Sequence, residues 1–340
     1  MKAMILAAGY GTRFRPVTYT LPKPLVPLCN KPLICWAVES LIAVGVGEVI
    51  VNVHHLAEAI EGHLRTHYLG EAEFHFSFEK EILGTGGGVR RVRAQLENET
   101  DFFLVNGDTV QFPRYDALLE ARRATGALAA LTLRYPSEGD RFTPVWFEDG
   151  FITGFGKGHG VAMMFSGAHA ISNRIFQYLP NKDFSGIVDE VYQPLLHSNR
   201  ETIAATFDDG ALWFDIGTPQ RYLSASTALL EAIVRGDLRP PRDSRLRGDS
   251  LIDHSAAVAK TLVRSCVGAR SIVHGELQDS VVWNDCSVGG NARLERCIVA
   301  HGTELSGHIE LQDALICRDD PAIPHDPAYE RRDGIVIVRI

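Results

Sequence analysis

Short apolar segments alternate with amphipathic ones over about the first 227 residues of this 340-residue chain. We expect strands at Lys2–Leu6, Glu48–Val53, Phe74–Glu79, Asp101–Asp108 and Ala127–Tyr135, and helices at 32–44, 56–68, 84–96 and 115–125. Continuous apolar strands that alternate with helices are typical of a mostly parallel sheet covered on both faces. Ligands bind at the carboxyl ends of such strands, so the loops that follow them are the candidate site.

The pattern changes after residue 230. Arg235–Asp249 is charged and contains prolines, which indicates a connector. Beyond it, aliphatic residues recur every five or six positions among small and polar ones: Val267, Ile272, Leu277, Val282, Val288, Leu294, Val299 and Leu305. This period fits the hexapeptide repeat of a β-helix, with each aliphatic side chain pointing inward. We therefore expect domains at 1–230 and 251–340, joined by 231–250. The apolar end GIVIVRI suits a last strand, whose partner the sequence does not identify.

The composition excludes several classes of protein. A net charge of −8 and a pI near 5.9 argue against a nucleic-acid binder, which usually carries a basic patch. The six cysteines form no CxxC pair, so reduced thiols are expected rather than zinc. We expect no secretory signal peptide, because the N-terminus enters an apolar strand without a basic segment and cleavage site. No apolar run reaches the roughly 20 residues of a membrane span. We expect a cytoplasmic protein without nucleic-acid or membrane partners.

The first apolar run leads straight into AAGYGTRFRP, Ala7–Pro16. Glycines let the backbone approach a phosphate closely, and oriented backbone N–H groups form an anion nest. Arg13, Arg15 and Lys23 add positive charge. The loop lacks the Gly-Lys-Ser/Thr of a Walker A loop and the third glycine of the dinucleotide fingerprint. Spacing alone therefore indicates either an anion site or a plain glycine turn with surface arginines.

The longer string LAAGYGTRFRPVTYTLPKPLVP, Leu6–Pro27, resembles the signature of the sugar-1-phosphate nucleotidyltransferases. The resemblance is strong over about residues 1–227 and weak over 250–317, and it implies an α/β Rossmann-like domain followed by a left-handed β-helix. It also implies that the loop wraps the phosphates of a nucleoside triphosphate, that Arg13 contacts them, and that Lys23 steadies the transferred phosphoryl group. The implied nucleotide-binding residues here are Ala7, Ala8, Gly9, Gly11, Thr12 and Arg13.

Two aspartates lie at expected strand ends. Asp108 closes VNGD, and Asp215 lies in ALWFDIGTP. Carboxylates suit Mg²⁺, although Asp is also a common helix cap and turn residue. The second segment matches the family's Trp-x-Asp-x-Gly-Thr-Pro motif, and the resemblance implies that both aspartates are catalytic metal ligands, with Asp108 also on the nucleotide side. We expect Mg²⁺ as the cofactor.

A second glycine loop, LGTGGG, follows the third expected strand. The resemblance implies that Gly84, Thr85 and Gly86 pack on the base and ribose, and that Glu79 reads the base edge. A carboxylate only accepts hydrogen bonds, and guanine presents N1–H and N2–H₂ together, whereas uracil presents N3–H alone. This favours GTP. Similarity to uridylyltransferases that act on N-acetylmuramate 1-phosphate, in TGGG and VNGD, leaves the base open.

The sugar side is less defined. Lys157 lies where the family has Glu-Lys-Pro and would bind the sugar phosphate, but glycines replace its neighbours. The resemblance implies that the backbone of Gly167, in FSGAHAIS, approaches the hexose, and that Asp189 or Glu190 accepts hydrogen bonds from sugar hydroxyls. Solvated lysine and surface helix acids are the alternatives for Lys157 and Asp189.

The expected reaction joins a nucleoside triphosphate and a sugar 1-phosphate into an NDP-sugar and releases pyrophosphate. The favoured pair is GTP with mannose 1-phosphate or a related hexose or heptose 1-phosphate. A catalytically silent NDP-sugar-binding regulatory subunit is the alternative from another class. A homo-oligomer, formed through the β-helix or the catalytic domain, is expected.

Overall fold

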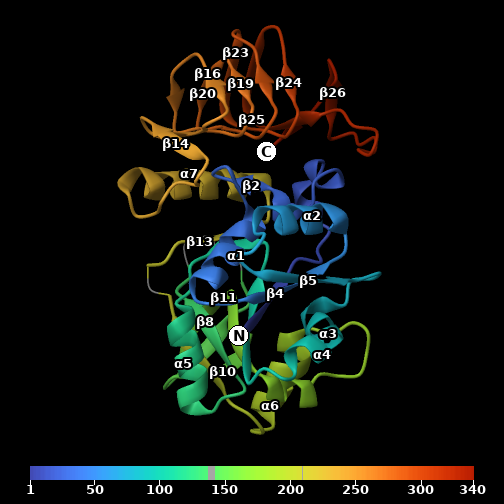
Figure 1. Ribbon diagram of the computed structural model, residues 1–340, viewed down its shortest axis with the longest axis vertical. Helices are drawn as coiled ribbons and strands as arrows, with labels where there is room; N and C mark the ends of the chain where they lie inside the picture. The colour runs from blue at the N-terminus through green and yellow to red at the C-terminus, as the bar shows by residue number, and fades with distance from the viewer. Residues whose placement is uncertain (137–141, 209) are drawn as a thin grey trace. The chain divides into compact units, whose positions relative to one another are not determined.

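The structure is a computed structural model that describes residues 1–136, 142–208 and 210–340 (Figure 1). The chain falls into two compact units, Met1–Gly9 with Ile34–Trp213, and Tyr10–Leu33 with Phe214–Ile340. The domain limits expected at 230 and 250 stay predictions. In the described ranges, no helix has both the length and the apolar character needed to cross a membrane.

The first unit is built on a mixed sheet that contains nine strands of the described chain, in the order β5-β4-β1-β6-β11-β8-β12-β10-β9. Four of them are parallel neighbours: β5 (Glu73–Phe78), β4 (Glu48–Val53), β1 (Lys2–Leu6) and β6 (Asp101–Asn106). The others are β11 (Val161–Ser172), β8 (Ala129–Arg134), β12 (Ile203–Phe207), β10 (Phe151–Phe155) and β9 (Val145–Glu148). β11 runs antiparallel to β6 and β8, whereas β12 is parallel to β8. The predicted mixed α/β sheet is confirmed.

The helices of this unit match the four expected ranges, with α6 as an additional helix. They are α1 (Leu33–Ala43), which begins at the unit boundary, α2 (Ala57–His67), α3 (Gly84–Arg91), α4 (Arg93–Leu96), α5 (Tyr115–Thr125) and α6 (Gln193–His197). The helix expected over 84–96 is broken at Val92, which joins α3 to α4. Shorter elements are β7 (Thr109–Gln111), the 3₁₀ helix η4 (Asn173–Gln177) and the π-helix η5 (Val188–Tyr192). Burial of Met4, Leu104 and Leu131 places the apolar core against the central strands.

The Leu6–Pro27 segment, here called the signature loop, leaves the first unit after Gly9, and the second unit begins at Tyr10. This loop forms three 3₁₀ turns, η1 (Thr12–Phe14), η2 (Val17–Tyr19) and η3 (Lys23–Leu25), and a small hairpin of β2 (Pro27–Leu28) and β3 (Lys31–Pro32). After β13 (Trp213–Asp215), which begins at the unit boundary, comes α7 (Pro219–Arg235). Thr218 caps α7 by accepting from the backbone N–H of Arg221, and Gly236 ends it in the left-handed conformation.

The C-terminal segment is a parallel β-helix with three stacks of short strands (Figure 1). One stack is β15 (Ser250–Asp253), β18 (Cys266–Val267), β21 (Val281–Val282), β23 (Ala292–Val299) and β25 (Ile309–Arg318). Another is β16 (Ala257–Val258), β19 (Ile272–Val273), β22 (Ser287–Val288) and β24 (Glu304–Leu305). The third is β17 (Leu262–Val263) and β20 (Glu276–Gln278), continued by β23 and β25. The left-handed sense of the β-helix stays a prediction.

The expected inward residues are buried, with one exception. Ile272 is 47% exposed, so its assignment to the core is wrong. Its neighbour Val273 is fully buried and aligns in register with Val258 and Val288. Successive residues of a strand point to opposite faces, so a shift of one position moves the side chain outward. A spacing of five or six residues could not resolve that shift.

Both ends of the β-helix are closed by antiparallel strands. β14 (Ser244–Arg247) pairs with β15 at one end, and β27 (Ile335–Arg339) pairs with β25 and β26 (Glu330–Arg332) at the other. The apolar tail GIVIVRI therefore forms a strand, and β25 is the partner that the sequence did not identify. The terminal parallel rungs β15 and β25 are thus paired, and the edges of this sheet are the short strands β14 and β26, of four and three residues, as is usual for protected sheet edges.

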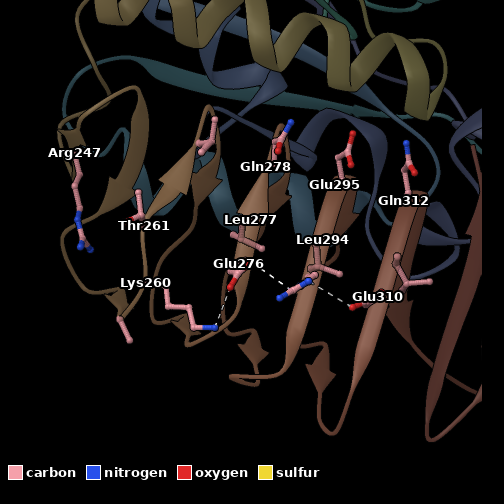
Figure 2. A pocket seen from close by; sticks show the side chains of 14 residues that line it. Arg247, Lys260, Thr261, Glu276, Leu277, Gln278, Leu294, Glu295, Glu310 and Gln312 are labelled. Atoms are coloured by element: carbon pink, nitrogen blue, oxygen red, sulfur yellow. Dashed lines mark hydrogen bonds and ion pairs between the residues drawn. The ribbon is translucent and has the colours of Figure 1, made fainter.

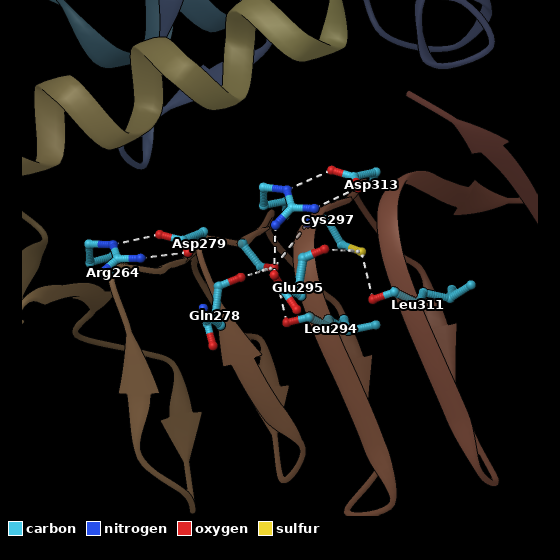
Figure 3. A network of polar contacts seen from close by, with 10 residues as sticks. Arg264, Gln278, Asp279, Leu294, Glu295, Cys297, Leu311 and Asp313 are labelled. Atoms are coloured by element: carbon cyan, nitrogen blue, oxygen red, sulfur yellow. Dashed lines mark hydrogen bonds and ion pairs between the residues drawn. The ribbon is translucent and has the colours of Figure 1, made fainter.

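Ion pairs stack at one corner of the coil (Figure 3). The Arg264 guanidinium donates to both carboxylate oxygens of Asp279 at 2.6 and 2.7 Å, and Arg296 binds Asp313 in the same way at 2.7 Å. The hydrogen bond from Arg296 lowers the pKa of the Asp313 carboxyl. All four residues have positive φ, between 41° and 50°. These pairs are solvent-exposed, so they fix the corner geometry more than they stabilise the fold.

One outer face of the β-helix has an open hollow of about 850 Å³ (Figure 2). A row of alternating charges crosses it, in which Glu276 lies 3.3 Å from Lys260 and 3.5 Å from Arg293, and Arg293 lies 3.8 Å from Glu310. Each charge therefore has an opposite neighbour. The hollow lacks the excess of one sign that would attract a phosphate or another charged ligand.

Candidate active site

The carboxyl ends of three parallel strands lie on one rung of the sheet. Leu6 of β1 aligns with Asn52 of β4 and with Asn106 of β6. The backbone N–H of Gly107 donates to the Leu6 carbonyl at 2.9 Å, which fixes the turn before Asp108 beside the start of the signature loop. Asp108 is partly exposed. The loops after β1 and β6 therefore lie at the same edge of the sheet, and they carry Ala7, Ala8, Gly9 and Asp108.

A buried chain of hydrogen bonds links the two glycine-rich loops. Asn52 Oδ1 accepts from the backbone N–H of Ala7 at 2.8 Å, and Asn52 Nδ2 donates to Glu79 Oε1 at 2.8 Å. Glu79 Oε2 accepts from the backbone N–H of Leu83 at 2.9 Å. Asn52 and Glu79 are each 4% exposed. The carboxylate expected to face a base edge therefore receives hydrogen bonds from protein groups on both of its oxygens.

The second glycine loop is held by the segment before η5. The backbone N–H groups of Gly86 and Gly87 donate to the Ser185 carbonyl at 2.8 and 3.2 Å. Thr85 Oγ1 accepts from the backbone N–H of Ile187 at 2.8 Å. Gly86 is buried, while Gly84 and Thr85 stay partly exposed at the start of α3. The loop is therefore ordered by backbone contacts and presents its first residues to solvent.

Gly167 lies at an irregularity of β11. The register of β11 against β8 shifts between Phe165 and His169, and Gly167 has φ of 109°, which a residue with a side chain rarely adopts. A Cβ there would lie 2.9 Å from Asn106 Nδ2, so glycine allows β11 to approach the end of β6. Burial lowers the pKa of the nearby His169 to about 3, so this histidine stays neutral.

The two other residues expected on the sugar side are exposed. Lys157 lies in the loop between β10 and β11, where a side chain on Gly158 would overlap Trp146. That contact gives a steric reason for glycine in place of the family's larger flanking residue. Asp189 lies in η5, and π-helical turns are frequent at functional sites. Within the described part of the chain, neither side chain forms a hydrogen bond with the residues of the two glycine-rich loops.

In the second unit, the signature loop packs on itself around Gly11. Gly11 has φ of 61°, its carbonyl accepts from Thr18 Oγ1 at 2.9 Å, and a Cβ on it would lie 2.9 Å from Lys23 Cβ. Lys23 is only 7% exposed, while Thr12 and Arg13 are exposed. Glycine at this position therefore lets the Lys23 stem pack against the turn that carries Arg13.

The Asp215 turn adjoins the same loop within this unit. Asp215 is partly exposed and forms an ion pair with Arg221 of α7, in which Nη1 lies 2.6 Å from Oδ2. A Cβ on Gly217 would lie 2.8 Å from Arg13 Nη1. The Arg13 guanidinium therefore rests on the Gly217 backbone, two residues after Asp215. The Arg13 guanidinium therefore occupies the space that a side chain at residue 217 would need, next to the ion pair of Asp215 and Arg221.

The family model described as nucleotidyl transferase matches residues 2–232. The chain belongs to this family. Among its relatives, the catalytic subunit beta of mannose-1-phosphate guanylyltransferase from Danio rerio is 29% identical, with 97% of this chain and 94% of that protein covered. A mannose-1-phosphate guanyltransferase from Hypocrea jecorina is 26% identical, with 96% of each covered. A crystal structure of HddC from Yersinia pseudotuberculosis matches with a TM-score of 0.57 at 25% identity, covering 67% of this chain and 99% of that one.

The expected nucleotidyltransferase activity is thereby confirmed, and the resemblance first read from the Leu6–Pro27 string holds over most of the chain. Three residues of this nucleotidyltransferase escaped sequence reasoning: Asn52, Asn106 and Arg221. The two asparagines carried a signal, because each is a polar residue near the end of an apolar strand, in EVIVNV and DFFLVN. Arg221 carried none, since helix arginines are ordinarily solvated.

The contact between Gly217 and Arg13 gives a direct test of where the guanidinium must lie. In this nucleotidyltransferase, Gly217→Ala should push the flexible Arg13 side chain aside at little cost in stability, because φ at Gly217 is not in the left-handed region. We expect kcat/KM to fall about 10- to 100-fold, since small misplacements of a charged group are costly. In an Arg13→Ala background the same change should have no further effect. An equal loss of kcat/KM in both backgrounds would show that Gly217 acts independently of Arg13.

Proposed function

We propose that this chain transfers a guanylyl group from GTP to mannose 1-phosphate and releases pyrophosphate. The observation that carries the proposal is the end-to-end match with relatives named mannose-1-phosphate guanyltransferase or guanylyltransferase, which extends through the β-helix segment. The two glycine-rich loops and the Arg13–Lys23 pair provide the features that a nucleoside triphosphate requires: backbone N–H donors and fixed positive charge. A related hexose or heptose 1-phosphate has the same reacting group.

The proposed reaction is an in-line displacement. An oxygen of the sugar phosphate attacks the α-phosphorus of GTP and forms the new O–P bond, while the bond from that phosphorus to the β-phosphate bridging oxygen breaks. The electron pair leaves with pyrophosphate. Arg13 and Lys23 stabilise the charge that grows on the phosphoryl and pyrophosphate oxygens. No protein base is needed, because the attacking phosphate is already anionic.

We propose Asp108 and Asp215 as the residues that would hold Mg²⁺. Both offer hard carboxylate oxygens, which suit this ion, and both are partly exposed rather than sealed in the core. Bound Mg²⁺ would neutralise phosphate charge and favour the leaving pyrophosphate. The Arg221 side chain pairs with one Asp215 oxygen, which fixes the orientation of that carboxylate.

The remaining residues have proposed roles by position. On the nucleotide side these are Ala7, Ala8, Gly9, Gly11, Thr12, Glu79, Gly84, Thr85 and Gly86, and on the sugar side Lys157, Gly167 and Asp189. For Glu79 we propose a positioning role, because its oxygens accept hydrogen bonds from Asn52 and Leu83.

A cytoplasmic location and a homo-oligomer stay predictions. Retention of Arg13, Lys23, Asp108 and Asp215 favours turnover over a silent regulatory subunit.

Pyrophosphate release over four NTPs plus dTTP, each against a panel of sugar 1-phosphates, tests the proposal. We expect GTP with mannose 1-phosphate to give the highest kcat/KM. A preference for UTP with N-acetylmuramate 1-phosphate would instead support the uridylyltransferase alternative and contradict the assignment of the base. Tight binding of an NDP-sugar with no turnover of any pair would support the silent subunit.

A further inference from the structure

The second compact unit contains the β-helix and the part of the signature loop that begins at Tyr10. Residues Tyr10–Leu33, which include Arg13 and Lys23, belong to the same compact unit as residues 214–340. The two cations that the proposed reaction requires are thus carried by a segment packed with the β-helix. This grouping connects the β-helix to the segment that carries the two cations, a connection that the strand repeats alone do not indicate.

A buried column of three aromatic side chains joins the loop to the β-helix through α7. Phe14 of η1 packs edge-on against Tyr222 of α7, with ring centroids 5.5 Å apart. Tyr222 packs edge-on against Trp283 of the β-helix at 6.1 Å. Phe14 and Tyr222 are fully buried, Trp283 is 1% exposed, and Trp283 is the largest fully buried side chain in the described part of the chain. Edge-to-face pairs of this kind favour one relative orientation of the rings.

Hydrogen bonds run along the same column. Trp283 Nε1–H donates to the Tyr222 hydroxyl at 2.9 Å, and that hydroxyl donates to the Pro27 carbonyl at 2.5 Å. Burial raises the pKa of Tyr222, so its hydroxyl keeps the proton that it donates. Trp283 therefore orients Tyr222, and Tyr222 fixes the end of the PKPLVP segment. A buried donor or acceptor that loses its partner carries a substantial desolvation cost, so the three groups favour a single arrangement.

The two residues that Tyr222 contacts, Phe14 and Pro27, lie close in sequence to Arg13 and Lys23. Phe14 follows Arg13 directly, and its backbone N–H donates to the Gly11 carbonyl at 2.9 Å. On the other side, the backbone N–H of Val26, next to Pro27, donates to the Lys23 carbonyl at 3.0 Å. Tyr222 thus contacts both branches of the loop, one beside each cation.

We propose that the β-helix supports the phosphate-binding loop, and that Trp283, acting through Tyr222, is a positioning residue for Arg13 and Lys23. The inference rests on the proposed function, because it assigns the two cations to a nucleoside triphosphate. It gives the β-helix a role in nucleotide affinity without any contact between the β-helix and the substrate. Tyr222 and Trp283 have no assigned place in the reaction itself.

Two variants and one control test the proposal. Tyr222→Phe removes the hydroxyl and keeps the ring, and Trp283→Phe removes the indole N–H and keeps an aromatic side chain. Val288→Ala is the matched control, because Val288 is a buried β-helix residue outside the aromatic column. Hydrogen exchange of peptides from residues 10–28 is measured in the nucleotide-free protein, and KM and kcat are measured for both substrates.

We expect exchange in residues 10–28 to accelerate about three- to tenfold in both Phe variants, with a similar rise in KM for the NTP, as expected for one buried hydrogen bond. KM for the sugar 1-phosphate should change less than twofold, and the control should match wild type. Wild-type exchange in both Phe variants, or the same acceleration in Val288→Ala, would overturn the proposal. If Trp283→Phe does not fold, Tyr222→Phe alone decides between these outcomes. Faster exchange without turnover of any substrate pair would contradict the proposed function but not the supporting role of Trp283.

Discussion

Asp108→Asn and Asp215→Asn are each expected to reduce Mg²⁺-dependent pyrophosphate release about 100- to 1,000-fold. Each change keeps the shape of the side chain and removes the charge that a hard divalent cation requires. Removing one preorganised electrostatic contact to a developing charge typically costs this much in rate. The measurement is kcat with a Mg²⁺ titration, in which the concentration for half-maximal rate should also rise.

The Arg221 ion pair supplies the control for Asp215. Asp215→Asn also weakens the contact between Arg221 Nη1 and Asp215 Oδ2, so part of its effect could come from α7 rather than from a metal. Arg221→Gln breaks the same pair but leaves the carboxylate, and we expect it to lose less than about tenfold. A loss in Arg221→Gln equal to that in Asp215→Asn would assign Asp215 a structural role. Wild-type rates in both aspartate variants would contradict the metal assignment.

Much of the fold was predictable because its signals are local. β1 and β4 match their predicted limits, and α5 matches Tyr115–Thr125, since apolar runs and amphipathic periods report directly on burial. β9 and β10 were not predicted, because they are short strands whose pairing depends on partners distant in sequence. The core assignment of Ile272 failed for a related reason, since only the register with Val258 and Val288 identifies Val273 as the inward residue.

The candidate site was predictable to the level of motifs but not of contacts. The GYGTR and VNGD motifs alone predict that Arg13 and Asp108 follow strands or turns, because these motifs are local in sequence. The contact of Gly217 with Arg13 joins positions about 200 residues apart, and so does the Tyr222–Pro27 hydrogen bond. No local pattern encodes such contacts. They arise because α7 returns the chain to the loop, which is a property of the folded unit.

Glu79→Gln is expected to destabilise the protein by about 1–3 kcal/mol and to leave the preference between GTP and UTP unchanged. Two donors, Asn52 Nδ2 and the Leu83 N–H, converge on the two carboxylate oxygens, and an amide offers only one oxygen. One buried donor must therefore lose its acceptor, which has a cost of this size. Thermal unfolding and the ratio of kcat/KM for the two nucleotides are the measurements.

Asn52→Leu is the matching change on the other side of the chain of hydrogen bonds. It removes the donor to Glu79 and the acceptor for the Ala7 N–H together, so a buried carboxylate loses one of its two donors. We expect a larger loss of stability, about 3–5 kcal/mol, and a rise in KM for the nucleotide, because the two glycine-rich loops are no longer tied. If Glu79→Gln instead changes the GTP-to-UTP ratio tenfold or more without loss of stability, Glu79 contacts the base directly. In that case the Glu79 carboxylate itself would accept hydrogen bonds from guanine, as its position in the sequence predicts, and it would not act only by holding the second glycine loop.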